Sequence, residues 1–408
     1  MFGTAFKPKI DNDSKKIESL LTRGVERVYP SAEFLRQALL SGRQLSIYLG
    51  IDPTGQSLHL GHAITLMKLR EFQDLGHKVI VMYGGFTATI GDPSGKLSAR
   101  RQLSQSEIKK NAAGYKKSIG KILDLKKNNI EFRDNADWSN KMKPADIMSI
   151  ASRFTVPQLL ERDMFQERLK GGKEIYLHEF LYPIFQAYDS VALDVDIEIG
   201  GNDQTFNMLA GRTLMRKLKN KEKMVISMKL LEDSSGKKMG KTEGNMVCLD
   251  QSADEMFGRI MSWADTLILP GLELCTTLGD SEIAETKQAL EAGSNPKDFK
   301  LKLAREVVTL YHGKKQADAA EANFANTFSV GGAPENLSEI EVMKGALLLD
   351  TVLKEGIVSS KSDWHRLVSG GAVSNLATNE KVSDPGYRIL ASATFRIGKK
   401  RFVRVLLK

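Results

Sequence analysis

The chain has 408 residues, of which 41% are hydrophobic and 27% charged, a profile that indicates a globular protein of two or three domains and excludes a disordered or fibrous one. It contains no run of 18 apolar residues and no apolar segment near the N-terminus, so neither a transmembrane helix nor a secretory signal is predicted. The net charge is +9, and two well-separated cysteines, Cys248 and Cys275, predict no disulfide and no zinc site and favour a reducing, cytoplasmic location.

The first part of the chain predicts an α/β fold. Residues 1–44 are predicted to be helical. A short strand at 45–50, a helix at 60–75 and a continuous apolar strand at 79–83 then form a βαβ unit, which implies a parallel sheet. The pattern predicts further helices at 104–127, at 144–190 and up to about 218, and further strands at 130–132, 195–199 and 224–231.

The rest of the chain is predicted to be helical and then basic. Periodic apolar residues predict helices over 250–325, and a tail from about residue 338 is predicted as a small α+β module with strands at 387–390 and 402–407. Residues 341–408 contain seven Lys and five Arg against six acidic residues, a net charge of +6. The predicted division is an α/β domain at 1–246, a helical domain at 247–328, a linker at 329–337 and a small basic α+β domain at 338–408.

The first chemical motif is His59-Leu-Gly-His62, at a junction between a loop and a helix. Two histidines three apart share one helical face, and the free amides and the dipole of a helix N-terminus favour phosphate. Gly61 removes a side chain, so that a nucleotide can stack close to the backbone. The alternative is a pair of surface histidines.

The second motif is Lys238-Met-Gly-Lys-Thr242, in a polar loop. Two lysines on a glycine-bearing loop can close over a triphosphate and stabilise charge on departing pyrophosphate, although most lysine-rich loops are merely solvated. Residues 90–96 are not a phosphate-binding P-loop, because three residues rather than four separate Gly91 from Gly95 and no Ser or Thr follows Lys96.

A third set of polar residues lies on a predicted helix. Tyr182, Gln186 and Asp189 are spaced four and three apart, so a phenol, an amide and a carboxylate share one face. An amphipathic helix with its polar side outward is the alternative. Farther along, the residues from Gly200 to Gln204 follow a strand, where Asp203 can accept hydrogen bonds from ribose hydroxyls, unless the segment is only a tight turn.

The two motifs in this order resemble those of the class I aminoacyl-tRNA ligases, HIGH and KMSKS, with Leu60, Gly240 and Thr242 as departures. The Gly-Lys-Thr ending is similar to the form in bacterial tyrosine–tRNA ligases. The resemblance implies a doubly wound catalytic fold, ATP as a substrate accompanied by Mg²⁺ without a fixed protein site, L-tyrosine and tRNA(Tyr) as the other substrates, and a homodimer.

The same resemblance implies roles for individual residues. Tyr48 and Asp189 would bind the phenol hydroxyl of tyrosine, and the α-amino and carboxylate groups would be held by Tyr182, Gln186, Asp92 and Gln204. The residues implied in ATP binding are Gly50, Asp52, Gly61, Gly200, Asp203 and Lys241. Those implied in catalysis are His59, His62, Lys96, Arg100, Lys238, Lys241 and Thr242.

The basic tail resembles an S4-type RNA-binding domain, with Lys361, Arg366, Lys399, Lys400 and Arg401 as the implied RNA contacts. A basic dimerisation module is the alternative for this tail. For the whole chain, the alternatives are a tryptophan–tRNA ligase, a small-molecule nucleotidyltransferase with an HxGH site, and an RNA-binding or splicing-accessory protein without catalytic activity.

Overall fold

The computed structural model describes residues 9–94, 103–232, 246–329, 339–376, 378, 380–398 and 401–408. The chain forms two compact units, which we describe separately. The first unit comprises residues 1–252 and 259–311, and the second comprises residues 253–258 and 312–408. No helix among the described residues is long and apolar enough to cross a membrane.

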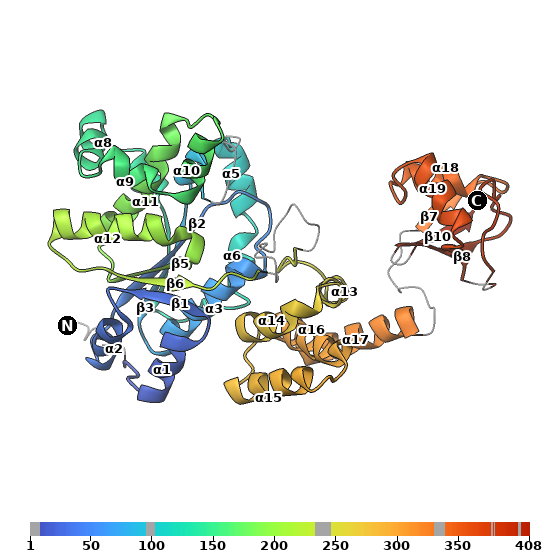
Figure 1. The fold of residues 1–408 in the computed structure, drawn as a ribbon, viewed down its shortest axis with the longest axis horizontal. Helices are drawn as coiled ribbons and strands as arrows, with labels where there is room; N and C mark the ends of the chain where they lie inside the picture. Colours follow the sequence, from blue (N-terminus) through green and yellow to red (C-terminus); the bar gives the residue numbers. More distant parts are fainter. Residues whose placement is uncertain are drawn as a thin grey trace, which may run out of the picture. The chain divides into compact units, whose positions relative to one another are not determined.

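A six-stranded sheet forms the centre of the first unit (Figure 1). Its strands, in spatial order, are β1 (Val25–Tyr29), β6 (Met224–Met228), β5 (Ile197–Gly201), β2 (Ser46–Ile51), β3 (Lys78–Tyr83) and β4 (Ile130–Asp134). From β6 to β4 all pairs are parallel, and β1 is antiparallel to β6. The predicted α/β class and parallel sheet are thus confirmed.

The order of the strands in this sheet indicates where a ligand would bind. The chain runs outward from β2 through β3 to β4, then returns to the other side of β2 and runs outward again through β5 and β6. In doubly wound sheets, ligands bind at the carboxyl ends of the strands where this direction changes. That point lies between β2 and β5, so the residues that follow these two strands are candidates for the functional site.

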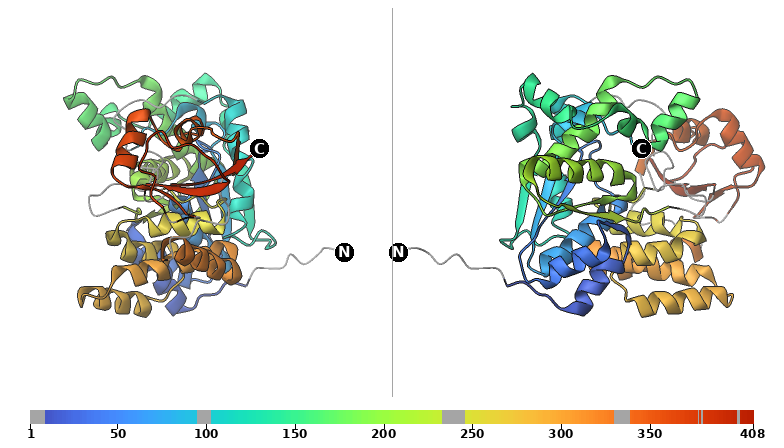
Figure 2. Two further views of the ribbon diagram at one scale, coloured as in Figure 1. Left: turned by 90° about the vertical axis from the view of Figure 1, so that its right-hand side faces the viewer. Right: turned by 60° about the vertical axis from the view of Figure 1, so that its left-hand side comes forward.

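Helices cover both faces of this sheet (Figures 1 and 2). The helices α11 (Leu177–Leu193) and α12 (Thr205–Lys219) pack against each other through a buried apolar cluster that includes Ala187 and Leu214. The other helices of this part are α1 (Ser14–Thr22), α2 (Ala32–Leu40), α3 (Leu60–Asp74), α4 (Thr87–Ile90), α5 (Gln105–Ala112), α6 (Tyr115–Ile119), α7 (Ala136–Ser139), α8 (Pro144–Ala151), α9 (Val156–Leu160), α10 (Asp163–Lys170) and the 3-10 turn η1 (Asn202–Gln204).

Strand β1 corrects the prediction that residues 1–44 are helical. Its sequence, Val-Glu-Arg-Val-Tyr, has no continuous apolar run, and among its residues only Val28 is buried. A short edge strand of this kind is stabilised by backbone hydrogen bonds to its neighbour rather than by an apolar face, so periodicity does not reveal it.

The later helices of the first unit confirm the predicted helical stretch after residue 250. They are α13 (Ala253–Met261, which spans the boundary between the units), the 3-10 turn η3 (Asp265–Leu267), α14 (Ile268–Cys275), α15 (Asp280–Glu291) and α16 (Pro296–His312). Arg23, the C-cap residue of α1, connects α1 with α14 because its Nε donates to the carbonyl of Glu273 at 3.1 Å.

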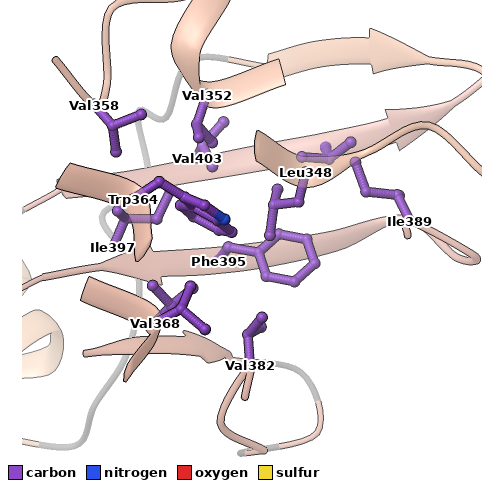
Figure 3. Packing of buried hydrophobic residues seen from close by; sticks show 12 residues of the cluster. Leu348, Val352, Val358, Trp364, Val368, Val382, Ile389, Phe395, Ile397 and Val403 are labelled. Atoms are coloured by element: carbon purple, nitrogen blue, oxygen red, sulfur yellow. The ribbon is translucent and has the colours of Figure 1, made fainter. Parts of the chain in front are cut away.

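The second unit contains α17 (Lys314–Ser329) and a small α+β fold. Its sheet has the order β7 (Glu339–Val342), β10 (Arg401–Leu407), β9 (Ala393–Ile397) and β8 (Val373–Asn375), and its two other helices are α18 (Leu348–Lys354) and α19 (Lys361–Ser369). Trp364 of α19 and Phe395 of β9 lie at the centre of its core (Figure 3). The indole Nε1 of Trp364 donates to the carbonyl of Pro385 at 2.9 Å.

The tail also corrects one strand prediction. Residues 402–407 form β10 as expected, but 387–390 form no strand. Tyr387 and Ile389 instead exchange backbone hydrogen bonds with residues just before and at the start of α18, around a single bridge between Leu347 and Arg388. This segment follows Pro385-Gly386, so it stays too short to extend the sheet.

Candidate functional site

The two histidines of the first motif meet at the N-terminus of α3. Their ring centroids lie 4.0 Å apart. The Nδ1 of His59 accepts from the amide of Gly61 at 3.1 Å, and the Nδ1 of His62 accepts from the amide of His59 at 3.3 Å. A neutral imidazole whose Nδ1 accepts carries its proton on Nε2. In this form both rings carry their N–H group at Nε2, and they lie at a helix end that favours anions.

Gly61 lies close to one of these rings. A Cβ at this position would lie 2.9 Å from Cε1 of His59, closer than side chains tolerate. The absence of a side chain at Gly61 therefore leaves room for the His59 ring in its capping position. This is a local reason for Gly61 in addition to the expected approach of a nucleotide.

The second motif lies outside the described residues, and so do Lys238, Lys241, Thr242, Lys96 and Arg100. The residues that follow this motif are described, and they form backbone hydrogen bonds with the segment around His59. The amide of Leu60 donates to the carbonyl of Val247 at 3.0 Å, and the amide of Leu249 donates to that of Leu58 at 2.8 Å. The segment immediately after the lysine motif is thus paired with the segment that carries the histidines.

Tyr48 and Asp189 are fully buried. Asp189 accepts hydrogen bonds from Nε1 of Trp138 at 2.8 Å and from Nδ2 of Asn135 at 3.2 Å. Burial raises the pKa of the Asp189 carboxyl well above its ordinary value, and the two N–H donors oppose that rise. Burial also raises the pKa of Tyr48, which the charges of Glu198 and Asp189 raise further. A tyrosine hydroxyl and a carboxylate are therefore both buried in a low-dielectric environment, near enough for the charge of Asp189 to act on Tyr48.

The predicted polar face of α11 exists, and it faces inward. The hydroxyl of Tyr182 donates to Oδ2 of Asp52 at 2.9 Å, at the carboxyl end of β2. Gln186 donates through Nε2 to Oε1 of Glu198 at 3.1 Å. Tyr182 and Asp189 are buried, so the alternative of an amphipathic helix with these groups outward is wrong.

Asp92 and Gln204, which are 112 residues apart in sequence, also meet. Oδ2 of Asp92 accepts from Nε2 of Gln204 at 2.7 Å, and its Oδ1 accepts from the amide of Ser94 at 2.9 Å. Arg162 lies beside them, with Nη2 donating to Oγ of Ser94 at 2.5 Å. Burial lowers the pKa of Arg162, opposed first by the charge of Asp92.

Most of the residues predicted for ATP lie at the carboxyl ends of β2 and β5 or just after them. Asp52 follows β2, where its Oδ1 accepts from Oγ1 of Thr87 at 2.8 Å. Gly200 is the next-to-last residue of β5, and Asp203 is exposed in η1. Gly50 is exposed near the end of β2. No three His, Cys, Asp or Glu side chains within the described part of the chain are grouped as a metal site requires.

Sequence reasoning missed several residues that support this site: Asn135, Trp138, Arg162, Ser190, Glu198 and Lys223. Asn135 and Trp138 come from a short helical turn after β4 that carries no motif. Glu198 had one available signal, because it is the only charged residue of β5. The structure shows that Glu198 is buried.

The comparisons with known proteins agree with this geometry. The family model for class I tRNA synthetases (W and Y) matches residues 40–329. The chain is 42% identical to a tyrosine–tRNA ligase of Carboxydothermus hydrogenoformans, over 98% of this chain and 99% of that protein. It is 39% identical to a tyrosine–tRNA ligase of Francisella tularensis, over 97% of this chain and 99% of that one. The chain belongs to the class I tRNA synthetases, among the bacterial-type tyrosine–tRNA ligases.

A solved structure has the same fold. A C-terminally truncated mitochondrial tyrosyl-tRNA synthetase of Aspergillus nidulans covers 77% of this chain and 94% of its own, with a TM-score of 0.64 at 24% identity. The relatives named tyrosine–tRNA ligase, which match nearly the whole chain, show that the alternatives of a tryptophan ligase and a small-molecule nucleotidyltransferase are wrong. The family membership confirms the resemblance that the sequence motifs indicated and the expected ligase activity.

Among the basic residues of the tail, Lys361 and Arg366 lie exposed on α19. Arg366 is paired with Asp363 at 2.7 Å. Arg401 donates to the carbonyl of Ile357 at 2.6 Å and lies 3.5 Å from Asp363, so it also holds the start of β10 in place. Lys399 and Lys400 lie outside the described residues.

Proposed function

We propose that this chain activates L-tyrosine with ATP and then transfers the tyrosyl group to the 3' end of tRNA(Tyr), with the residues named above as its site. The observation that carries the assignment of tyrosine is the buried Asp189 carboxylate, oriented by Trp138 and Asn135 and lying near Tyr48. A buried acceptor of this kind favours a substrate that brings a hydroxyl, because phenylalanine would leave part of the accepting capacity of the carboxylate unused.

The first step is adenylate formation. The tyrosine carboxylate attacks the α-phosphorus of ATP, and pyrophosphate leaves. Tyr182, Gln186 and Asp92 bind the ammonium group, and Gln204 holds the carboxylate end for in-line attack. The Nε2–H groups of His59 and His62 stabilise negative charge on the phosphates as it develops, together with Lys238, Lys241, Thr242, Lys96 and Arg100. Gly50, Asp52, Gly61, Gly200 and Asp203 receive the nucleotide, and Mg²⁺ enters with ATP.

The second step is aminoacyl transfer. A ribose hydroxyl at the 3' end of the tRNA attacks the acyl carbon of tyrosyl-adenylate, and AMP leaves. No side chain of the protein needs to act as a covalent nucleophile, so catalysis consists of positioning and charge stabilisation. In the division of the chain that we propose, residues 1–246 catalyse both steps, 247–328 form a helical domain, and 338–408, after the linker 329–337, bind tRNA as an S4-like domain.

We further infer that the enzyme is cytoplasmic and acts as a homodimer. Large apolar side chains are exposed on three helices: Met148 on α8 is 69% exposed, Val156 on α9 is 63% exposed and Leu177 on α11 is 78% exposed. Exposed apolar surface of this kind favours protein association. Sedimentation of the protein at micromolar concentration tests this, and a monomer at that concentration contradicts it.

The experiment that tests the function is amino-acid-dependent exchange of labelled pyrophosphate into ATP. Tyrosine should support exchange, whereas phenylalanine and tryptophan should not at the same concentration. Addition of tRNA(Tyr) should then yield tyrosyl-tRNA. Exchange that is equally rapid with phenylalanine would contradict the assignment of the Asp189 pocket.

A further inference from the structure

Behind the candidate tyrosine pocket lies an ion pair with no access to solvent. Glu198 is 2% exposed and Lys223 is fully buried, and the two side chains are in direct contact. We propose that this pair is a positioning device that keeps Gln186 turned so that its amide oxygen faces the ammonium group of tyrosine. The inference rests on the proposed function, because it takes Gln186 as part of the tyrosine site.

The pair belongs to a closed network built from three elements. Nζ of Lys223 donates to Oγ of Ser190 on α11 at 2.8 Å, and Ser190 Oγ lies 3.3 Å from Oε2 of Glu198 on β5. Space for the network comes from α12, where a Cβ at Gly211 would lie 2.5 Å from Lys223 Nζ and 2.8 Å from Ser190 Oγ. The network therefore depends on a glycine at that point of α12.

The network determines the orientation of the Gln186 amide. An ionised carboxylate can only accept hydrogen bonds, so the group that faces Glu198 must be the NH₂ of Gln186, 3.1 Å away. The amide oxygen Oε1 is then turned away from Glu198. It is buried and has no hydrogen-bond partner among the described residues. Such an oxygen is suited to accept from an ammonium group.

Stability alone is a poor explanation for this pair. Burial lowers the pKa of Lys223, and Glu198 opposes that shift. Replacing a buried ion pair with apolar residues is often neutral or stabilising, so its energetic contribution is a weak reason for its presence. Orientation of neighbouring polar groups is a role that apolar residues cannot fill. The charged and titratable groups around the pair are Tyr48 on β2, Asp189 on α11 and Arg212 on α12.

The test compares the binding of tyrosine with that of 3-(4-hydroxyphenyl)propionate, which lacks the ammonium group. In the isosteric variant Glu198→Gln, the new amide can donate to Gln186 and reverse its orientation. We expect the Kd for tyrosine to rise about tenfold while the Kd for the propionate stays within about twofold. Lys223→Met should also raise the Kd for tyrosine more than the Kd for the propionate. An equal rise in both Kd values would show a packing role and overturn the proposal.

Two further variants complete the design. Lys68→Met removes another buried lysine, on α3, which donates to the carbonyl of Leu20 and pairs with Glu71. It should lower the Tm without changing tyrosine binding, and a tenfold loss there would count against a specific role for Lys223. If Glu198→Gln does not fold, the uncharged double variant Lys223→Met/Glu198→Gln replaces it, with the same selective loss expected and equal losses overturning the proposal.

Gln186→Met separates this inference from the proposed function. This variant should weaken the binding of tyrosine but not the binding of the propionate. If it weakens the binding of neither ligand, the assignment of the tyrosine site is wrong, and the positioning role is wrong as well. If it selectively weakens the binding of tyrosine and Glu198→Gln does not, only the positioning role is wrong.

Discussion

At the scale of single residues, Asp189 is the group on which substrate choice depends. We expect Asp189→Ala to fold and to lose tyrosine activation, because the phenol hydroxyl loses its buried acceptor and Trp138 and Asn135 lose their partner. The loss in kcat/KM for tyrosine should be about 5- to 150-fold, the equivalent of about 1–3 kcal/mol. Pyrophosphate exchange with tyrosine and with phenylalanine measures it. A variant that still prefers tyrosine to phenylalanine as strongly as the parent would refute the assignment.

His77 leads to a second prediction at this scale, for pH. Burial lowers its pKa from 6.5 to about 4, with the charge of Arg43 acting in the same direction. Its Nδ1 accepts from the amide of Leu45 at 3.3 Å, which fits the neutral ring. Between pH 6.5 and about 4, His77 is therefore protonated in the unfolded chain but neutral in the folded chain. Stability contributed by the neutral ring should fall as the pH decreases from 6.5 to about 4, by up to about 3 kcal/mol.

The measurement is the free energy of unfolding of the first unit, by denaturant titration at several pH values. The variant His77→Gln should lose less stability than the parent over this window, since its side chain does not titrate. His178→Gln, at a half-buried position on α11, serves as the control and should follow the parent. Identical pH profiles for the parent and His77→Gln would contradict the prediction.

At the scale of elements, the N-terminus of α3 is expected to act on the transition state rather than on tyrosine binding. Removing one charge-stabilising donor, as in His59→Ala or His62→Ala, should slow adenylate formation by about 10²- to 10³-fold. The Kd for tyrosine should change by less than about threefold, because the rings face phosphate rather than the amino acid. Lys238→Ala and Lys241→Ala should behave in the same way.

Gly61→Ala is the matched backbone variant, because its Cβ would displace the His59 ring without removing it. It should slow adenylate formation in the same direction and by less than His59→Ala. Pre-steady-state kinetics separate the rate of the step from the binding of tyrosine. An effect confined to the Kd for tyrosine would show that these residues do not stabilise the transition state of adenylate formation.

At the scale of the whole molecule, truncation near Pro334 should separate the two half-reactions. All the residues proposed for adenylate formation precede that point, whereas two-thirds of the net charge lies after residue 340. Exchange of pyrophosphate should remain largely intact, and charging of tRNA should fall sharply, most of all at physiological salt. If the tail only maintains the fold or a dimer, both half-reactions will be lost. A monodisperse truncated enzyme that charges tRNA normally would end the proposal.

Point variants in the tail refine this test. Charge reversal at Lys399, Lys400 and Arg401 should weaken tRNA binding and flatten its dependence on salt. Because Arg401 also contacts Ile357 and Asp363, its reversal can disturb the fold. Lys361→Glu, at an exposed position of α19, should weaken tRNA binding without a change in Tm, which makes it the cleaner variant.

The sequence by itself determined features that depend on neighbours along the chain. The βαβ order predicted the parallel sheet, since an apolar strand, a helix and another apolar strand in succession have few other arrangements. Helical spacing correctly placed Tyr182, Gln186 and Asp189 on one face. The HxGH motif correctly indicated the start of a helix, because capping is a local interaction between residues two and three apart.

Only the tertiary structure decided which distant groups meet. Asp92 and Gln204 are joined across 112 residues, and Asp189 and Trp138 across 51. Such contacts follow from the order of strands in the sheet, and a periodic pattern does not specify that order. The sequence also could not distinguish the buried Glu198 from a solvated one, because the Lys223 side chain that makes its burial tolerable arrives from the neighbouring end of β6.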